Sequence, residues 1–145
     1  MIPRCQTTVQ VHIGDAIAEL RLLNEPVPRP LRLPTEDEVS RAEQDLGISF
    51  PPDYRRFLLE ASDVVFSTKE PCRVTPGSGY RHLVTTAREA WEIGVPRDWL
   101  PFCEDNADYY CLSGNTVRYW SHNGTTDEQW PDLGTWIGEV WIGGH

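Results

Sequence analysis

The stretch TEDEVSRAEQDLGISFPPDYRRFLLEA, residues 35–61, decides the fold. Thr35 and Glu38 have the spacing of a capping box, which favours the start of a helix. Gly47 stands where a left-handed helix end is expected, and the two prolines at 51–52 open a second helix. Apolar residues recur at helical spacing in both segments: Val39, Ala42, Leu46, Tyr54, Phe57, Leu58 and Ala61. The sequence therefore predicts a helical hairpin with one apolar side.

The residues after this hairpin change to shorter, β-type patterns. Apolar runs at 64–66, 72–74 and 83–84 are separated by turn residues, and they predict short strands. Thr86 and Glu89 repeat the capping-box spacing, which predicts that a short helix begins there.

Three further strands are predicted at 99–103, 109–113 and 116–121, with hairpin turns between them. Asp132 is placed to cap a closing helix. The apolar face of that helix is Leu133, Trp136, Ile137, Val140 and Trp141. Helices, then strands, then one helix predict an α+β fold, in which the hairpin and the C-terminal helix pack against a single antiparallel β-sheet.

The chain divides into a lead-in and a main part. Residues 1–34 contain a short amphipathic helix pattern around Ile13, Ile17 and Leu20, followed by a proline-rich connector. Residues 35–145 carry the remaining predicted elements. Because 145 residues are typical of one domain, we expect one compact domain overall.

Charge limits the classes of partner. The chain has 22 acidic and 13 basic residues and a net charge of −9. This acidity disfavours nucleic acids and anionic membranes, which need a broad basic face, and favours a basic protein. No apolar run is long enough for a membrane span, and the N-terminus has no signal-peptide pattern, so we expect a cytoplasmic protein.

The four cysteines show no metal-binding or redox spacing. Cys5, Cys72, Cys103 and Cys111 contain no C-x-x-C pair and no histidine at zinc-finger spacing. We expect reduced, mostly buried thiols, although Cys103 and Cys111 could face each other across one turn and form a disulfide. No cofactor and no metal are expected.

The order of these motifs resembles the SUKH superfamily, which contains fungal Smi/Knr-type cell-wall regulators and many bacterial immunity proteins. The resemblance spans roughly residues 33–141. Glycines are frequent in the family's acidic turn, where this chain has Asn106 and Ala107. The matching segments are Leu33–Val39, Leu46–Gly47, Phe50–Leu58, Trp99–Phe102, Glu104–Leu112 and Gly114–His122.

This resemblance implies a non-enzymatic, SUKH-like binding domain over residues 35–145. In bacteria such proteins are commonly antitoxins, each of which binds one toxin domain and blocks it. An acidic surface suits basic nuclease toxins, because it can mimic the polyanion in their clefts. The alternative is an intracellular regulatory or scaffold protein of the Smi/Knr type.

Acidic residues dominate the stretch from 104 to 132, which has six of them against the single Arg118. Trp130 stands beside Pro131 in a polar segment, so of the six tryptophans it is the one least expected in the core. It could supply the apolar contact that anchors a partner. A solvated face that only maintains solubility is the alternative interpretation. The predicted partner-binding residues are Glu104, Asp105, Asp108, Asp127, Glu128 and Trp130.

Catalytic and metal sites are not predicted. The acidic segment 104–108 lacks the pattern of an EF-hand loop. Ser121, His122 and Asp127 invite a triad interpretation, but no nucleophile elbow is present. We expect His122 to pack on Trp120 or to bond a loop carbonyl, and we assign no catalytic residue.

Overall fold

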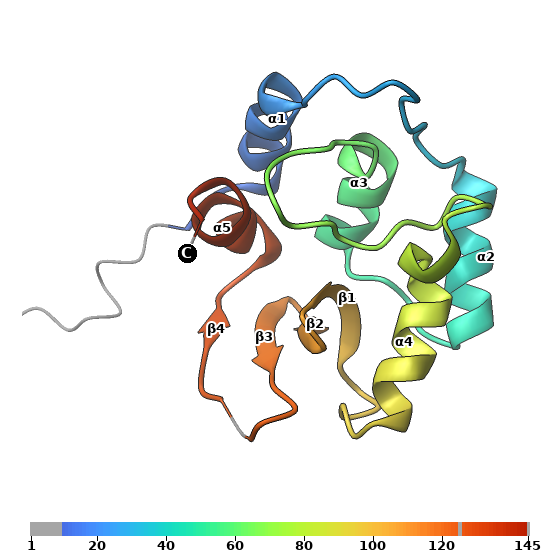
Figure 1. Ribbon diagram of the computed structural model, residues 1–145, viewed down its shortest axis with the longest axis vertical. Helices are drawn as coiled ribbons and strands as arrows, with labels where there is room; N and C mark the ends of the chain where they lie inside the picture. Colours follow the sequence, from blue (N-terminus) through green and yellow to red (C-terminus); the bar gives the residue numbers. More distant parts are fainter. Residues whose placement is uncertain (1–9, 125, 145) are drawn as a thin grey trace, which may run out of the picture.

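The structure, a computed structural model, describes residues 10–124 and 126–144, apart from the side chain of Tyr80. Cys5 lies outside these ranges. Helices lie above and to one side of an antiparallel sheet of order β1-β2-β3-β4, which confirms the α+β prediction (Figure 1). The elements are α1 (Ile13–Leu23), α2 (Glu36–Leu46), α3 (Pro52–Ala61), η2 (Gly79–Arg81), α4 (Leu83–Glu92), β1 (Leu100–Asp105), β2 (Asp108–Ser113), β3 (Thr116–Trp120), β4 (Gln129–Trp130), α5 (Leu133–Trp136) and the π-helical η3 (Ile137–Ile142).

The helical hairpin forms as the sequence predicts. The Thr35 hydroxyl accepts a hydrogen bond from the Glu38 N–H, and the Glu38 carboxylate accepts one from the Thr35 N–H. Gly47 ends α2 with a φ of 70°. Glu43 then joins the two helices, because its carboxylate accepts from the Phe50 N–H at 2.7 Å and from Arg55 at 2.8 Å.

Aromatic rings connect the hairpin to the sheet and to the C-terminal helix. The ring of Tyr54 lies 5.9 Å from that of Phe102, which lies 5.0 Å from the ring of Trp136. Trp136 in turn lies 5.2 Å from Tyr110 of β2. The predicted packing of the hairpin against the sheet is therefore confirmed, with the apolar residues of both helices buried in one core.

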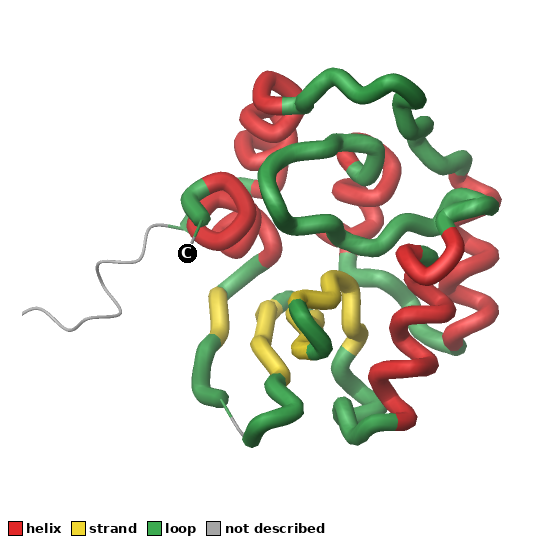
Figure 2. Tube along the Cα trace, in the orientation of Figure 1, coloured by secondary structure: helices red, strands yellow, loops and turns green. Residues whose placement is uncertain are grey.

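The middle of the chain differs from its prediction. Leu83 and Val84 begin α4 rather than a strand, and the N-cap is His82, whose Nδ1 accepts from the Val84 N–H at 3.2 Å. The runs at 64–66 and 72–74 take part only in isolated bridges. These apolar runs are too short for their β-propensity to outweigh tertiary contacts. Figure 2 shows this segment as loop and helix.

The C-terminal segment is capped as expected but contains an unpredicted strand. Asp132 accepts from the Thr135 N–H at 2.8 Å and caps α5. Trp130, which we expected in a loop, lies in β4 opposite Val117. Two residues are too few for a detectable alternation, so only the pairing with β3 defines this strand.

The lead-in packs on the rest of the chain. Four residues of α1 are buried: Ile13, Ala16, Ile17 and Leu20. The connector is attached to the loop after α3, because Val65 donates to the Asn24 side chain and accepts from the Glu25 N–H, both at 2.8 Å. The division of the chain at residue 34 stays a prediction.

The suggested disulfide between Cys103 and Cys111 is wrong. The two-residue turn at 106–107 sets a register in which Cys103 faces Tyr110, and a register shift between Pro101 and Cys103 then places Cys111 opposite Pro101. The two thiols belong to separate cores. Cys72, Cys103 and Cys111 are free, and burial raises the pKa of each thiol, that of Cys72 to about 11. These thiols are therefore protonated and unreactive near neutral pH.

Within the described residues, no helix has the length and apolar character that crossing a membrane requires.

Candidate functional site

The strand register brings the predicted acidic segments to one end of the sheet. Asp105 pairs with Asp108 beside the β1–β2 turn, and Tyr109 pairs with Trp120 at the end of β3. The loop from β3 to β4 therefore lies at the same end as that turn. Asn106 and Ala107 both have positive φ, 53° and 71°, as a tight hairpin turn of this kind requires.

Asp108 holds this end of the sheet together. Its carboxylate accepts from the Tyr119 hydroxyl at 2.7 Å and from the His122 N–H at 3.0 Å. The Nδ1 atom of His122 lies 2.6 Å from the same carboxylate. The expectation that His122 bonds a loop carbonyl is therefore wrong, because a carboxylate on the neighbouring strand is a stronger acceptor, whereas the packing of His122 on Trp120 stays a prediction.

These contacts perturb the ionisation of Asp108. Partial burial opposes the charged form, but the hydrogen bonds from Tyr119 and His122 outweigh it and lower the pKa of the carboxyl. Burial, followed by the hydrogen bond to Asp108, raises the pKa of Tyr119. The ionised Asp108 carboxylate therefore has a structural role, because its oxygens are already hydrogen-bonded to Tyr119 and His122.

Replacing Asp108 with Asn is expected to cost about 1–3 kcal/mol of stability at pH 7, because an amide NH2 group then faces a donor. A lowered folded pKa stabilises the protein above the ordinary Asp pKa of about 3.9 and loses that effect as the pH falls through the folded value. Urea unfolding from pH 7 down to pH 2 should show the difference from wild type shrinking below about pH 4. Asp127→Asn, at an exposed side chain, is the control. A difference that stays constant with pH would contradict this role of Asp108.

The other predicted acids differ in their surroundings. Asp105 lies 3.9 Å from the Lys69 amine, and Glu104, on the opposite face of the sheet, lies 3.8 Å from Arg81. Asp127 and Glu128 are exposed in the β3–β4 loop, and neither has a cationic partner among the described residues. The free negative charge at this end therefore comes chiefly from these last two residues.

Trp130 is half-buried against an aromatic row. Its ring lies 5.7 Å from that of Tyr110, which lies 4.9 Å from that of Tyr119. The amine of Lys69 lies 5.9 Å from the centre of the Tyr110 ring. Burial is the main cause that raises the pKa of Tyr110, and the negative charges of nearby acids, including Asp105 and Glu128, add to it. These acids are therefore close enough to the Tyr110 ring to interact with it electrostatically.

We call this surface the acidic aromatic face. Its residues are Asp105, Asp108, Tyr119, Trp130 and the adjoining Asp127 and Glu128, and the buried ring of Tyr110 lies beneath them. Of the predicted site, only Glu104 is directed to the other face of the sheet. Sequence reasoning missed Tyr110, Tyr119 and Lys69. The alternation Asp108, Tyr110, Leu112 could have indicated Tyr110, because alternate residues of a strand share a face.

No cluster of three or more histidine, cysteine or acidic side chains suited to a metal occurs within residues 10–124 and 126–144.

Comparison with known proteins identifies the family. Residues 13–142 match the family model SUKH_5, described as SMI1-KNR4 cell-wall. The chain belongs to the SUKH family. This SUKH chain is also similar to a protein from Pseudomonas syringae pv. tomato of known crystal structure, with 40% identity and a TM-score of 0.84. The match covers 90% of this chain and 98% of that one. None of the curated proteins compared is significantly similar.

Family membership supports a general mode of action. SUKH proteins are generally non-enzymatic immunity or regulatory proteins, and they act through protein–protein interaction. The match begins within the lead-in, at the first residue of α1.

Proposed function

We propose that this SUKH protein is a cytoplasmic immunity protein that binds and neutralises a cognate toxin domain of basic charge, such as a nuclease. The observation that carries the proposal is the acidic aromatic face. There, exposed carboxylates border the half-buried rings of Tyr119 and Trp130 at one end of the sheet, in a chain with a net charge of −9.

The two kinds of residue on this face have different tasks. Asp127 and Glu128 attract a basic partner over a distance, so they set the association rate and its dependence on salt. Trp130 supplies apolar contact area once the partner has arrived, so it sets the dissociation rate. Asp108 keeps the β1–β2 turn and the β3–β4 loop in register through Tyr119 and His122.

The experiment uses the toxin domain encoded by the gene adjacent to that of this protein. The variant Asp127→Lys/Glu128→Lys should associate about tenfold more slowly at low salt and show a weaker salt dependence. Asp15→Lys/Glu19→Lys is the matched control, because it changes the net charge equally on exposed residues of α1, away from this end of the sheet (Figure 1). Stopped-flow association and protection of cells that express the toxin are the measurements.

The contribution of Trp130 to binding is tested separately on the same complex. Trp130→Ala should raise the dissociation rate about thirtyfold, which corresponds to a hot-spot loss of about 2 kcal/mol, whereas Trp130→Phe should retain part of the affinity. If wild-type protein fails to bind the adjacent toxin, the immunity function is wrong. If it binds but both pairs of charge reversals slow association equally, the acidic aromatic face is not the contact surface.

A further inference from the structure

A second, chemically different hollow adjoins the acidic aromatic face at Lys69, whose amine also lies 3.9 Å from the Asp105 carboxylate. It is a pocket of about 310 Å³ between the proline-rich connector, the loop that follows α3, and the C-terminal helical segment. Apolar side chains form its floor, among them Phe57, Val64 and Trp141, which are all buried. Ligand pockets of this size with an apolar lining and a few polar groups are typical of small-molecule sites.

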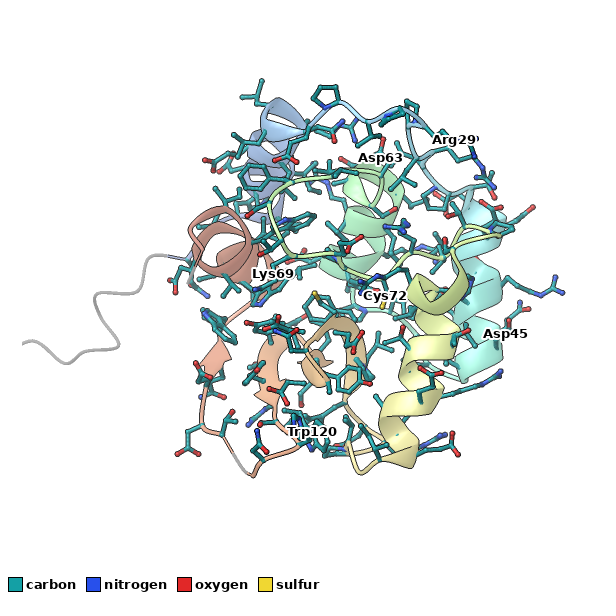
Figure 3. The ribbon with its side chains drawn as sticks, viewed as in Figure 1. Arg29, Asp45, Asp63, Lys69, Cys72 and Trp120 are labelled. Atoms are coloured by element: carbon teal, nitrogen blue, oxygen red, sulfur yellow. The ribbon has the colours of Figure 1, made fainter. Side chains whose placement is uncertain are left out.

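The rim of this pocket gathers positive charge in a strongly acidic protein. Arg29, Lys69 and Arg73 line it, together with one acidic residue, Glu70. Glu70 is engaged by Arg81 at 3.1 Å. Within the described part of the chain, the guanidinium groups of Arg29 and Arg73 have neither a carboxylate partner nor a hydrogen bond to another residue. Figure 3 labels Arg29 on the connector and Lys69 on the loop after α3.

Most other arginines are already engaged. Arg21 pairs with Asp63, Arg56 with Glu60, and Arg55 with both Glu36 and Glu43. Arg97 and Arg118 lie over tryptophan rings, at 4.2 Å from Trp91 and 5.5 Å from Trp99. Among the arginines of residues 10–124 and 126–144, only Arg29, Arg41 and Arg73 have no ion pair, side-chain hydrogen bond or ring contact, and two of these three line one pocket.

The walls are held in place by long-range contacts. Val27, Arg29 and Leu31 are alternate residues of the connector, and all three line the pocket. The connector is tied to the opposite wall through Val65, and the Trp141 indole N–H donates to the Phe66 carbonyl at 2.9 Å. The pocket is thus a formed part of the fold, with an apolar floor and a cationic rim.

We propose that this pocket binds a small amphipathic anion, whose apolar body rests on the floor and whose anionic oxygens are bound by Arg29 and Arg73. Planar guanidinium groups suit this task, because each can donate two parallel hydrogen bonds to a carboxylate, sulfonate or phosphate. A cationic ligand of the same shape would be repelled by the rim. Neither Arg29 nor Arg73 belongs to the acidic aromatic face, so the two proposals can be tested on different residues.

The first test uses defined probes on the full chain. The fluorescent anion 8-anilinonaphthalene-1-sulfonate should bind saturably with one site per chain, and octanoate should displace it. Octylammonium, with an apolar tail of similar length and the opposite charge, should not displace it. Absence of saturable binding, or equal displacement by both octyl compounds, would overturn the proposal.

The second test locates the site. Arg29→Gln/Arg73→Gln should weaken binding of the sulfonate probe about tenfold or more, because it removes the charge-assisted hydrogen bonds. Arg41→Gln is the control, since Arg41 is an exposed arginine of α2 outside this pocket. Val27→Trp should block binding by filling the apolar space while leaving the charge unchanged. Thermal unfolding verifies that each variant is folded. Equal affinities for the double variant and the control would show that the probe binds elsewhere and would refute this assignment.

Discussion

Replacing Leu58 with Ala is expected to lower the free energy of unfolding by about 2–5 kcal/mol, the range for buried large-to-small changes. Leu58 has 0% of its surface exposed and lies in α3, on the side of the hairpin that faces the core. The substitution removes apolar contacts and leaves a cavity, which the surrounding rings can fill only in part. Urea unfolding at neutral pH is the measurement.

Leu22→Ala is the matched control for this prediction. This substitution removes the same atoms from another helix, α1, but 87% of the surface of Leu22 is exposed. Its loss should alter stability by less than about 0.5 kcal/mol. If the two variants unfolded at the same urea concentration, the hairpin would not be packed as described.

Replacing Gly134 with Ala is expected to destabilise the protein by about 3 kcal/mol, near the upper end of the usual overpacking range. Gly134 lies in α5, where the helix meets the backbone of residues 11–13. A Cβ atom there would overlap the carbonyl oxygen of Val11 and lie 3.2 Å from the Ile13 nitrogen. Backbone atoms cannot move aside as a flexible side chain can, so α1 and α5 would have to separate.

Gly138→Ala tests the cause of this effect. A Cβ at Gly138 would meet only the Val11 side chain, at 3.4 Å, which is ordinary contact. We expect it to be neutral or slightly stabilising, because alanine loses less backbone entropy than glycine on folding. Thermal unfolding of both variants is the measurement. A Gly134→Ala protein as stable as Gly138→Ala would show that the close approach of α5 to the lead-in is absent.

The site was partly predictable from charge alone. The acids at 105, 108, 127 and 128 were identified because they outnumber the basic residues around them, and the strand register does bring them to one end of the sheet. The contacts that each of these carboxylates makes were not predictable. Whether an acid is free, paired with a cation or bonded by a hydroxyl depends on residues far away in the chain, such as Lys69 for Asp105.

The pocket was not predictable from the sequence for the same reason, because residues far apart in the chain form it. Its rim joins Arg29 of the connector to Arg73, and its floor adds Trp141. No pattern in the sequence links positions so far apart, and each residue alone is an ordinary arginine or tryptophan. The proline-rich connector, which indicated only an extended segment, is one of the pocket walls.

The sequence by itself determined the elements whose signals are local. Thr35 with Glu38, Gly47, and Asp132 each act on a backbone group within a few residues, so the helix ends they define form as expected. Tertiary structure decided what depends on pairing between distant segments: the strand at Trp130, the opposite faces of Cys103 and Cys111, and the Asp108 contacts. The physical reason is that a cap or a turn is a short-range hydrogen-bonding arrangement, whereas register and burial are settled only when the sheet and the core form together.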